Sequence, residues 1–198
     1  MLKMIEGKRI FVPVTLILVG YTISQIMTAG SYVAALPYLM TPSVDFAFIF
    51  FFFAFTASSL ARLAPGNGPR FLMRNRRYIG LCFALVHGAH GVFVLSNLAL
   101  TDETRPPLVF AAGALAYALL IAMTLTSNNA SVRRLGAKRW KLLHKVGSYF
   151  IWAIFASKAP EILKLSPVSW IPILCFVALG LRIAAYQKGR KKQKQMAA

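Results

Sequence analysis

The stretch RRYIGLCFALVHGAH, residues 76–90, places two arginines directly before an apolar run that contains two histidines. The run continues to about residue 100, close to the ~20 residues that a helix needs to cross the hydrocarbon layer of a bilayer. Ionisable side chains are costly inside a bilayer, so those found there are candidates for function. The stretch therefore predicts a membrane-spanning helix with His87 and His90 as candidate functional residues.

The rest of the chain has the same apolar character. Of its 198 residues, 58% are hydrophobic and only 14% are charged, too few charges to cover the surface of a soluble domain of this size. We therefore expect an all-α, polytopic membrane bundle of six transmembrane helices spanning residues 10–186. The expected spans are residues 10–29, 44–63, 78–100, 107–126, 138–157 and 167–186, of which the fifth has amphipathic first turns.

The basic residues predict how the bundle lies in the membrane. The formal net charge is +18, and 20 of the 23 lysines and arginines fall in residues 1–9, between spans two and three, between spans four and five, or from Arg182 onward. By the positive-inside rule, both termini are cytoplasmic in a bacterial-type inner membrane. The charge then reflects orientation and contact with anionic lipid rather than nucleic acid. Residues 1–9 form a cytoplasmic N-terminus, and residues 187–198 a basic tail that we expect to be disordered.

No nucleotide-binding motif appears in the chain. It contains neither GxGxxG nor a P-loop, so no flavin or NAD(P) site is expected. Electrons would have to come from a quinol, from a separate flavoprotein, or through a partner membrane subunit. The two cysteines, Cys82 and Cys175, lie inside apolar runs and are interpreted as buried small hydrophobes.

The three histidines are the main candidates for chemistry. His87 and His90 share one face of the third span, and the neighbouring Gly88 and Gly91 would let a flat ring or another helix approach. His144 begins the fifth span, which runs parallel to the third. One alternative is that each is a neutral imidazole hydrogen-bonded to a neighbouring helix. Three histidines on two parallel spans favour iron ligation, as in bundles that hold b-type haem.

Three arginines could complete such a site. Arginines at the cytoplasmic ends of spans suit an anionic group, such as a haem propionate or a lipid phosphate. The alternative is that their side chains extend to the interface and bind nothing specific. The candidates are Arg62, Arg77 and Arg182.

Several short motifs together resemble the ferric-reductase-like transmembrane domain superfamily. This superfamily includes ferric reductases, NADPH oxidases and the haem-binding membrane subunit of the methionine sulfoxide reductase system. The resemblance covers about residues 45–185. It depends on the order and spacing of Arg76-Arg77-x-x-Gly80-Leu81 leading to His90, then Thr126-Ser127, then Leu135-Gly136 with Trp140 and Leu143-His144.

The resemblance implies haem ligands on spans three and five, with two histidines thirteen residues apart on span five. His90 falls at an outer ligand position and His144 at an inner one, but Ser157 stands thirteen residues after His144. The usual two same-level pairs therefore cannot be assembled. His144 should lie roughly 10–15 Å nearer the cytoplasm than the other two histidines. His87, one turn lower than His90, is then the better partner for His144; a five-coordinate haem or no haem are the alternatives.

These observations favour a b-type cytochrome that carries electrons from a quinol or a flavoprotein to an acceptor at the outer face or on a partner subunit. As an enzyme, the chain would be a component of a transmembrane electron-transfer oxidoreductase. The alternative is a haem-free six-span scaffold or accessory subunit of a larger membrane complex, favoured by Ser157 and by the different heights of the histidines. A transporter is disfavoured because the spans contain so little charge.

Overall fold

The computed structural model describes residues 6–160 and 170–197, which are almost entirely helical and contain no strand. The all-α prediction is therefore confirmed for this part of the chain. The elements are η2 (Gly7–Ile10), α1 (Phe11–Ala29), α2 (Tyr32–Leu63), α3 (Asn67–Leu100), α4 (Pro107–Leu125), α5 (Asn129–Leu135), α6 (Ala137–Ser157) and α8 (Trp170–Ala197).

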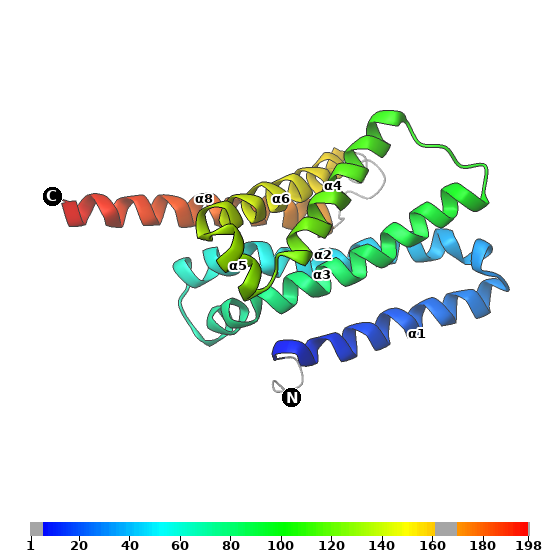
Figure 1. The fold of residues 1–198 in the computed structure, drawn as a ribbon, viewed down its shortest axis with the longest axis horizontal. Coiled ribbons are helices and arrows are strands. Elements are labelled where there is room, and N and C mark those ends of the chain that lie inside the picture. The colour runs from blue at the N-terminus through cyan, green and yellow to red at the C-terminus, as the bar shows by residue number, and fades with distance from the viewer. Residues whose placement is uncertain (1–5, 161–169, 198) are drawn as a thin grey trace.

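Helix α2 lies at the centre of the bundle (Figure 1). It packs most extensively against α3 and then against α8, and it also contacts α1. Helix α4 pairs with α6 and crosses α3 obliquely, so that the ends of α3 and α4 nearest residues 101–106 diverge (Figure 1). Helix α1 is peripheral, with Val14 as its buried residue.

Five of these helices are long and apolar enough to cross a membrane. They include Gly7–Ala29 and Pro107–Leu125 at the shorter end, the long helices α2 and α3, and Trp170–Met196. Helix α6 is not apolar enough to be counted with these five helices, because its first turns carry Lys138, Arg139 and Lys141. A multi-pass membrane protein is therefore supported, while the expected fifth span, residues 138–157, stays a prediction.

Helix α2 begins twelve residues before the expected start of the second span, at Tyr32 instead of residue 44. The segment contains Pro37 and Pro42, and proline usually interrupts a helix because it has no N–H to donate. The carbonyl of Tyr38, which Pro42 cannot bond, instead accepts the hydroxyl of Tyr21 from α1 at 3.0 Å. A neighbouring helix therefore compensates for the proline, and the helix continues.

Two other boundaries differ from the predictions. Helix α3 begins at Asn67, eleven residues before the expected third span. Helix α8 continues to Ala197, so the prediction of a disordered tail is wrong. Lysine, arginine and glutamine dominate residues 187–196, and these residues favour helix when they extend one already formed. The expected first residues of span six, 167–169, lie outside the described residues.

An aromatic cluster holds the middle of the bundle together. Phe48, Phe51 and Phe55 of α2 are buried, at 0%, 4% and 2% exposure, and contact Phe155 of α6 and Phe83 of α3. The ring centroids of Phe48 and Phe155 lie 4.9 Å apart in an edge-to-face arrangement, a favourable geometry for aromatic pairs. The cluster fixes the second half of α6 against α2 and α3, beside His87.

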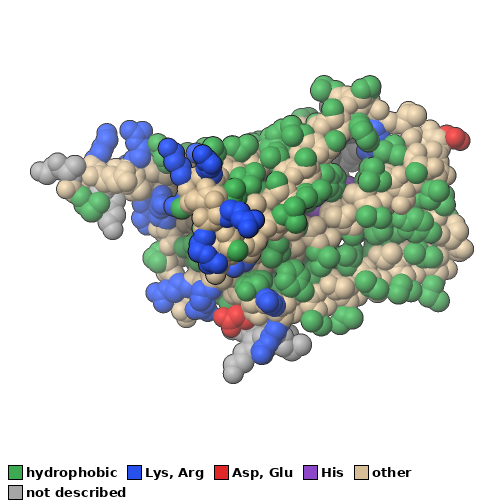
Figure 2. All heavy atoms as spheres, in the orientation of Figure 1, with side chains coloured by type: hydrophobic (Ala, Val, Ile, Leu, Met, Phe, Trp, Pro, Cys, Tyr) green, Lys and Arg blue, Asp and Glu red, His purple; other side chains and the backbone are tan. Residues whose placement is uncertain are grey.

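The charged side chains divide between the two ends of the molecule. The start of α1, the α2–α3 connection, α5 and the C-terminal end of α8 lie at one end (Figure 1). Most of the lysine and arginine side chains visible in Figure 2 gather at this end. The fold therefore brings together the segments that the sequence places on the cytoplasmic side.

Candidate functional site

His90 is held by α2 through one ring nitrogen. Its Nδ1 lies 3.0 Å from the carbonyl oxygen of Met40 and 3.2 Å from the hydroxyl of Ser43. A carbonyl oxygen only accepts hydrogen bonds, so Nδ1 carries the proton in the neutral ring and Nε2 keeps its lone pair. Ser43 is 5% exposed, and its hydroxyl donates to the same carbonyl at 2.8 Å. The arrangement leaves Nε2 as the ring nitrogen that could bind a metal.

His87 lies in a stack of rings one helical turn before His90. Its ring centroid is 5.1 Å from that of Phe83, 5.3 Å from that of His90 and 5.2 Å from that of Tyr117 on α4. Its Nδ1 is buried and has no hydrogen-bond partner. Buried polar atoms without partners are rare in proteins, and each calls for an explanation such as a bound group.

The two glycines beside these histidines have different roles. A Cβ on Gly91 would lie 2.7 Å from the ring of Tyr117, so Gly91 allows α4 to approach α3 closely. A Cβ on Gly88 would meet nothing within 4 Å, so the surface of α3 is open at Gly88. Figure 2 shows histidine side chains between α3 and α4, where the two helices diverge. We call this region the α3–α4 recess.

His144 lies in a different environment, near the basic end of the bundle. Its Nε2 is 3.2 Å from the hydroxyl of Thr126, and its ring lies 4.2 Å from that of Trp140, centroid to centroid. The indole N–H of Trp140 donates to the Thr126 carbonyl at 2.9 Å. These contacts tie the end of α4 to the start of α6, so they give the Thr126 and Trp140–His144 motifs a structural role.

The structure does not bring His144 and His87 together. Phe155, eleven residues after His144 on α6, lies beside His87 with ring centroids 5.9 Å apart. At 1.5 Å per residue, His144 is roughly 16 Å along α6 from the level of His87. Ser157 is exposed at the end of α6, where its hydroxyl donates to the Ile154 carbonyl. The bonding distances of one iron ion cannot join these two levels.

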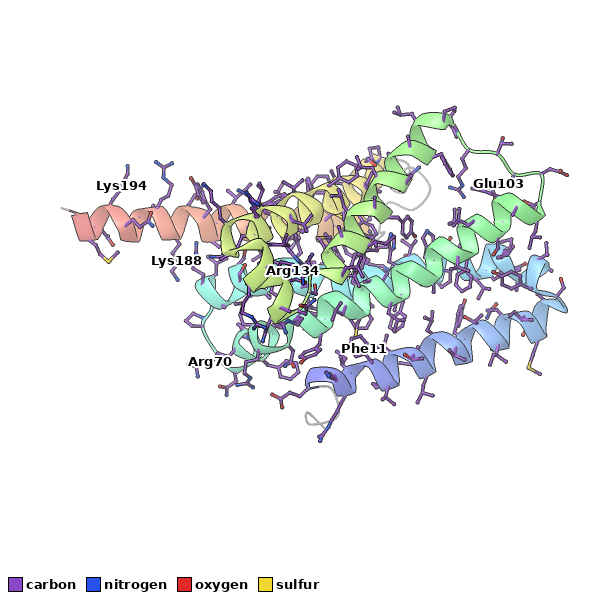
Figure 3. All side chains as sticks on the ribbon, in the orientation of Figure 1. Phe11, Arg70, Glu103, Arg134, Lys188 and Lys194 are labelled. Atoms are coloured by element: carbon purple, nitrogen blue, oxygen red, sulfur yellow. The ribbon has the colours of Figure 1, made fainter. Side chains whose placement is uncertain are left out.

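The three candidate arginines make contacts between helices. Arg182 of α8 donates to the hydroxyl of Tyr149 at 2.8 Å and to the carbonyl of Phe55 at 2.7 Å, and its guanidinium lies over both rings. Arg62 donates to the Ala185 carbonyl, and Arg77 to Asn129. These bonds connect α2 with α8 and α3 with α5, near the basic end. Figure 3 shows how densely side chains fill the space between the helices there.

Sequence reasoning missed several residues near His90. Ser43 and Met40 fall before the expected start of span two, so they were not considered as helical neighbours. Arg105, in the α3–α4 connection, has a buried Nε without a hydrogen-bond partner, while its Nη2 pairs with Glu103 at 3.1 Å. The sequence does carry one signal for Arg105, which is that basic residues are scarce in the outer loops.

Within residues 6–160 and 170–197, no group of three or more His, Cys, Asp or Glu side chains could hold a metal ion. The long apolar helices and the histidines on an inward face define the chain as a multi-pass helical membrane protein with a candidate site between α2, α3 and α4.

Comparison with known proteins identifies the family. Residues 41–155, more than half of the chain, match the family described as "Ferric reductase like transmembrane component", and the chain belongs to this family. This confirms the resemblance seen in the sequence motifs. No solved structure matches.

Curated relatives have the name "Protein-methionine-sulfoxide reductase heme-binding subunit MsrQ". Those of Brucella ovis, Brucella canis and Brucella suis are each 37% identical to the chain over 106 residues. The match covers 50% of this chain and 45% of each relative, so the chain spans about half the length of the curated relatives it matches.

Proposed function

We propose that the chain is a membrane electron-transfer subunit that binds a b-type haem through Nε2 of His90. The observation that carries the proposal is the bond from Nδ1 of His90 to the Met40 carbonyl, which leaves Nε2 free. Histidines that bind metals commonly donate their other ring nitrogen to a carbonyl or carboxylate in this way. The relatives named as heme-binding subunits support the same cofactor.

The positions of the three histidines favour a five-coordinate iron. His87 and His90 lie on one face of one helix, so they cannot occupy opposite sides of one porphyrin. His144 lies roughly 16 Å from their level along α6, and its Nε2 is engaged by Thr126. The chain has no fourth histidine. We infer that His90 supplies the one protein nitrogen and that His87 lines the site.

The bound haem would accept and release single electrons. The chain's own residues bind and surround it: His90 provides the ligand, and Tyr117, Phe83 and Phe155 keep water from the ring of His87. The unpartnered nitrogens of His87 and Arg105 fit polar or acidic groups brought into the α3–α4 recess. Arg77 lies thirteen residues before His90 on α3, roughly 20 Å along the helix, and Arg62 and Arg182 lie at the same basic end. The three arginines would therefore meet lipid headgroup phosphates rather than the propionates of a haem held by His90.

The orientation that we propose has six spans with both termini in the cytoplasm, in a bacterial-type inner membrane. Its support is the gathering of basic segments at one end of the bundle. Electrons would come from quinol or from a separate flavoprotein on the inner side. They would leave to an external acceptor or to a partner oxidoreductase subunit, as the names of the relatives suggest.

The alternative function is a haem-free scaffold or accessory subunit. It is favoured by Ser157 at the position where relatives are expected to carry a second ligand on this helix, and by the separation of His144 from the other histidines. Fold resemblance alone does not carry over a cofactor.

The two functions are separated by visible spectroscopy of the protein purified in detergent from haem-replete cells. We expect a reduced-minus-oxidised spectrum with a sharp Soret band. We also expect carbon monoxide to bind the reduced protein readily, because one iron position is open. A colourless protein supports the scaffold, and a haem that does not bind carbon monoxide contradicts five-coordination.

A further inference from the structure

We propose that Ser43 and the Met40 carbonyl are positioning groups that hold His90 as an Nε2 ligand and set the reduction potential of the iron it binds. The inference rests on the proposed haem function and adds to it a specific control of the site. Neither residue was a candidate in the sequence, and both come from α2, the helix that faces His90.

The proline-containing part of α2 presents these groups. Pro42 lies between Met40 and Ser43 in the chain, and its missing N–H leaves the Tyr38 carbonyl for the Tyr21 hydroxyl. A proline within a helix lacks the N–H that would bond the carbonyl four residues earlier, and it commonly kinks the helix. The Met40 carbonyl lies half a turn after Tyr38. It accepts hydrogen bonds from two side chains, the Ser43 hydroxyl at 2.8 Å and Nδ1 of His90 at 3.0 Å.

The proton positions follow from these contacts. The Ser43 hydroxyl has one proton, which it gives to the Met40 carbonyl, so a lone pair of its oxygen faces Nδ1 of His90 at 3.2 Å. Two acceptors therefore share one N–H. His87, on the same helix face, has no partner at Nδ1. The two histidines thus differ in the support they receive, and only His90 is fixed in one tautomer by its neighbours.

Acceptors at Nδ1 have a known effect on a metal bound at Nε2. They increase the electron donation of the imidazole to the metal, which favours the oxidised iron and lowers its reduction potential. Loss of one acceptor should therefore raise the potential and weaken binding. Because Ser43 is 5% exposed, water cannot readily replace its hydroxyl.

The test compares three variants of the haem-loaded full chain. Ser43→Ala should raise the midpoint potential and weaken haem binding about tenfold, the lower end of the range for lost outer-shell partners. Ser43→Thr, which keeps the hydroxyl, should restore both values. Ser59→Ala is the matched control, because Ser59 has the same 5% exposure on α2 but lies sixteen residues away.

The outcomes separate this inference from the proposed function. If His90→Ala abolishes haem binding while Ser43→Ala matches the wild type in potential and affinity, the positioning role is wrong and the haem function stands. If the wild type binds no haem, the proposed function fails. Nitrogen-15 NMR of the haem-free chain gives a second readout, assigned with His87→Ala and His144→Ala. Protonation of His90 at Nδ1 supports the positioning role, and protonation at Nε2 overturns it.

Discussion

His87 of α3 lies beside Phe155 of α6, with the two ring centroids 5.9 Å apart. This contact aligns the heights of the two helices, and it places His144, eleven residues earlier on α6, roughly 16 Å away along that helix. The three histidines therefore form a pair on α3 and a separate residue on α6, nearer the basic end of the bundle.

The contact of Gly91 with Tyr117 predicts a position-specific effect of alanine. Gly91→Ala should lower the free energy of unfolding, because its Cβ would lie 2.7 Å from the Tyr117 ring and overpacking costs about 1–3 kcal/mol. Gly88→Ala is the control on the same helix; with nothing within 4 Å, it should be neutral or stabilise by up to about 1 kcal/mol. Thermal unfolding in detergent measures both, and equal effects would contradict the close approach of α4.

Arg182 is predicted to stabilise the bundle by joining α8 to α2 and α6. Arg182→Gln removes the bonds to Phe55 and Tyr149 and the ring contacts, so we expect a loss of about 2–4 kcal/mol. Tyr149→Phe keeps the ring and removes one bond to a charged group, so it should cost about 1.5 kcal/mol. Denaturant or thermal unfolding of both variants is the measurement.

The control for Arg182 is Arg190→Gln on the same helix. Arg190 is exposed, and its guanidinium lies 6.0 Å from the Tyr186 ring centroid. We expect no measurable change in its unfolding. A similar loss in both variants would show that positive charge on α8, and not the contacts of Arg182, stabilises the bundle.

The six-span arrangement predicts which positions each side of the membrane can reach. In a background without the native cysteines, an impermeant thiol reagent should label Asp102→Cys and Ser157→Cys in spheroplasts. It should label Asn67→Cys and Lys188→Cys only in inverted vesicles. All four positions are exposed in the structure. Ser157 is decisive for α6: labelling from the same side as Lys188 would mean that α6 does not cross the membrane.

Much of the fold could be predicted because apolar runs and charge positions are properties of the chain itself. The start of α1 and both ends of α4 lie within one residue of the expected spans. The start of α2 could not be predicted, since the helix passes through Pro37 and Pro42 only where a neighbour such as Tyr21 satisfies the freed carbonyl. That compensation is a contact between distant residues and leaves no local pattern.

The site was only partly predictable for the same reason. The spacing of His87 and His90 places them on one face, and the structure bears this out with rings 5.3 Å apart. The spacing cannot say which ring nitrogen is occupied. The partners of His90 come from Met40 and Ser43, about 50 residues away in sequence, and the Thr126 bond of His144 likewise crosses between helices. Tertiary packing decides these contacts.

The most direct test of the central claim is haem binding by three single variants, His87→Ala, His90→Ala and His144→Ala, purified from haem-replete cells. We predict that His90→Ala loses the Soret and visible bands of the bound haem. His144→Ala should keep them unchanged, and His87→Ala should keep them with shifted maxima, because His87 lines the site. Loss of the bands in His144→Ala with full retention in His90→Ala would contradict the assignment of His90 as the ligand.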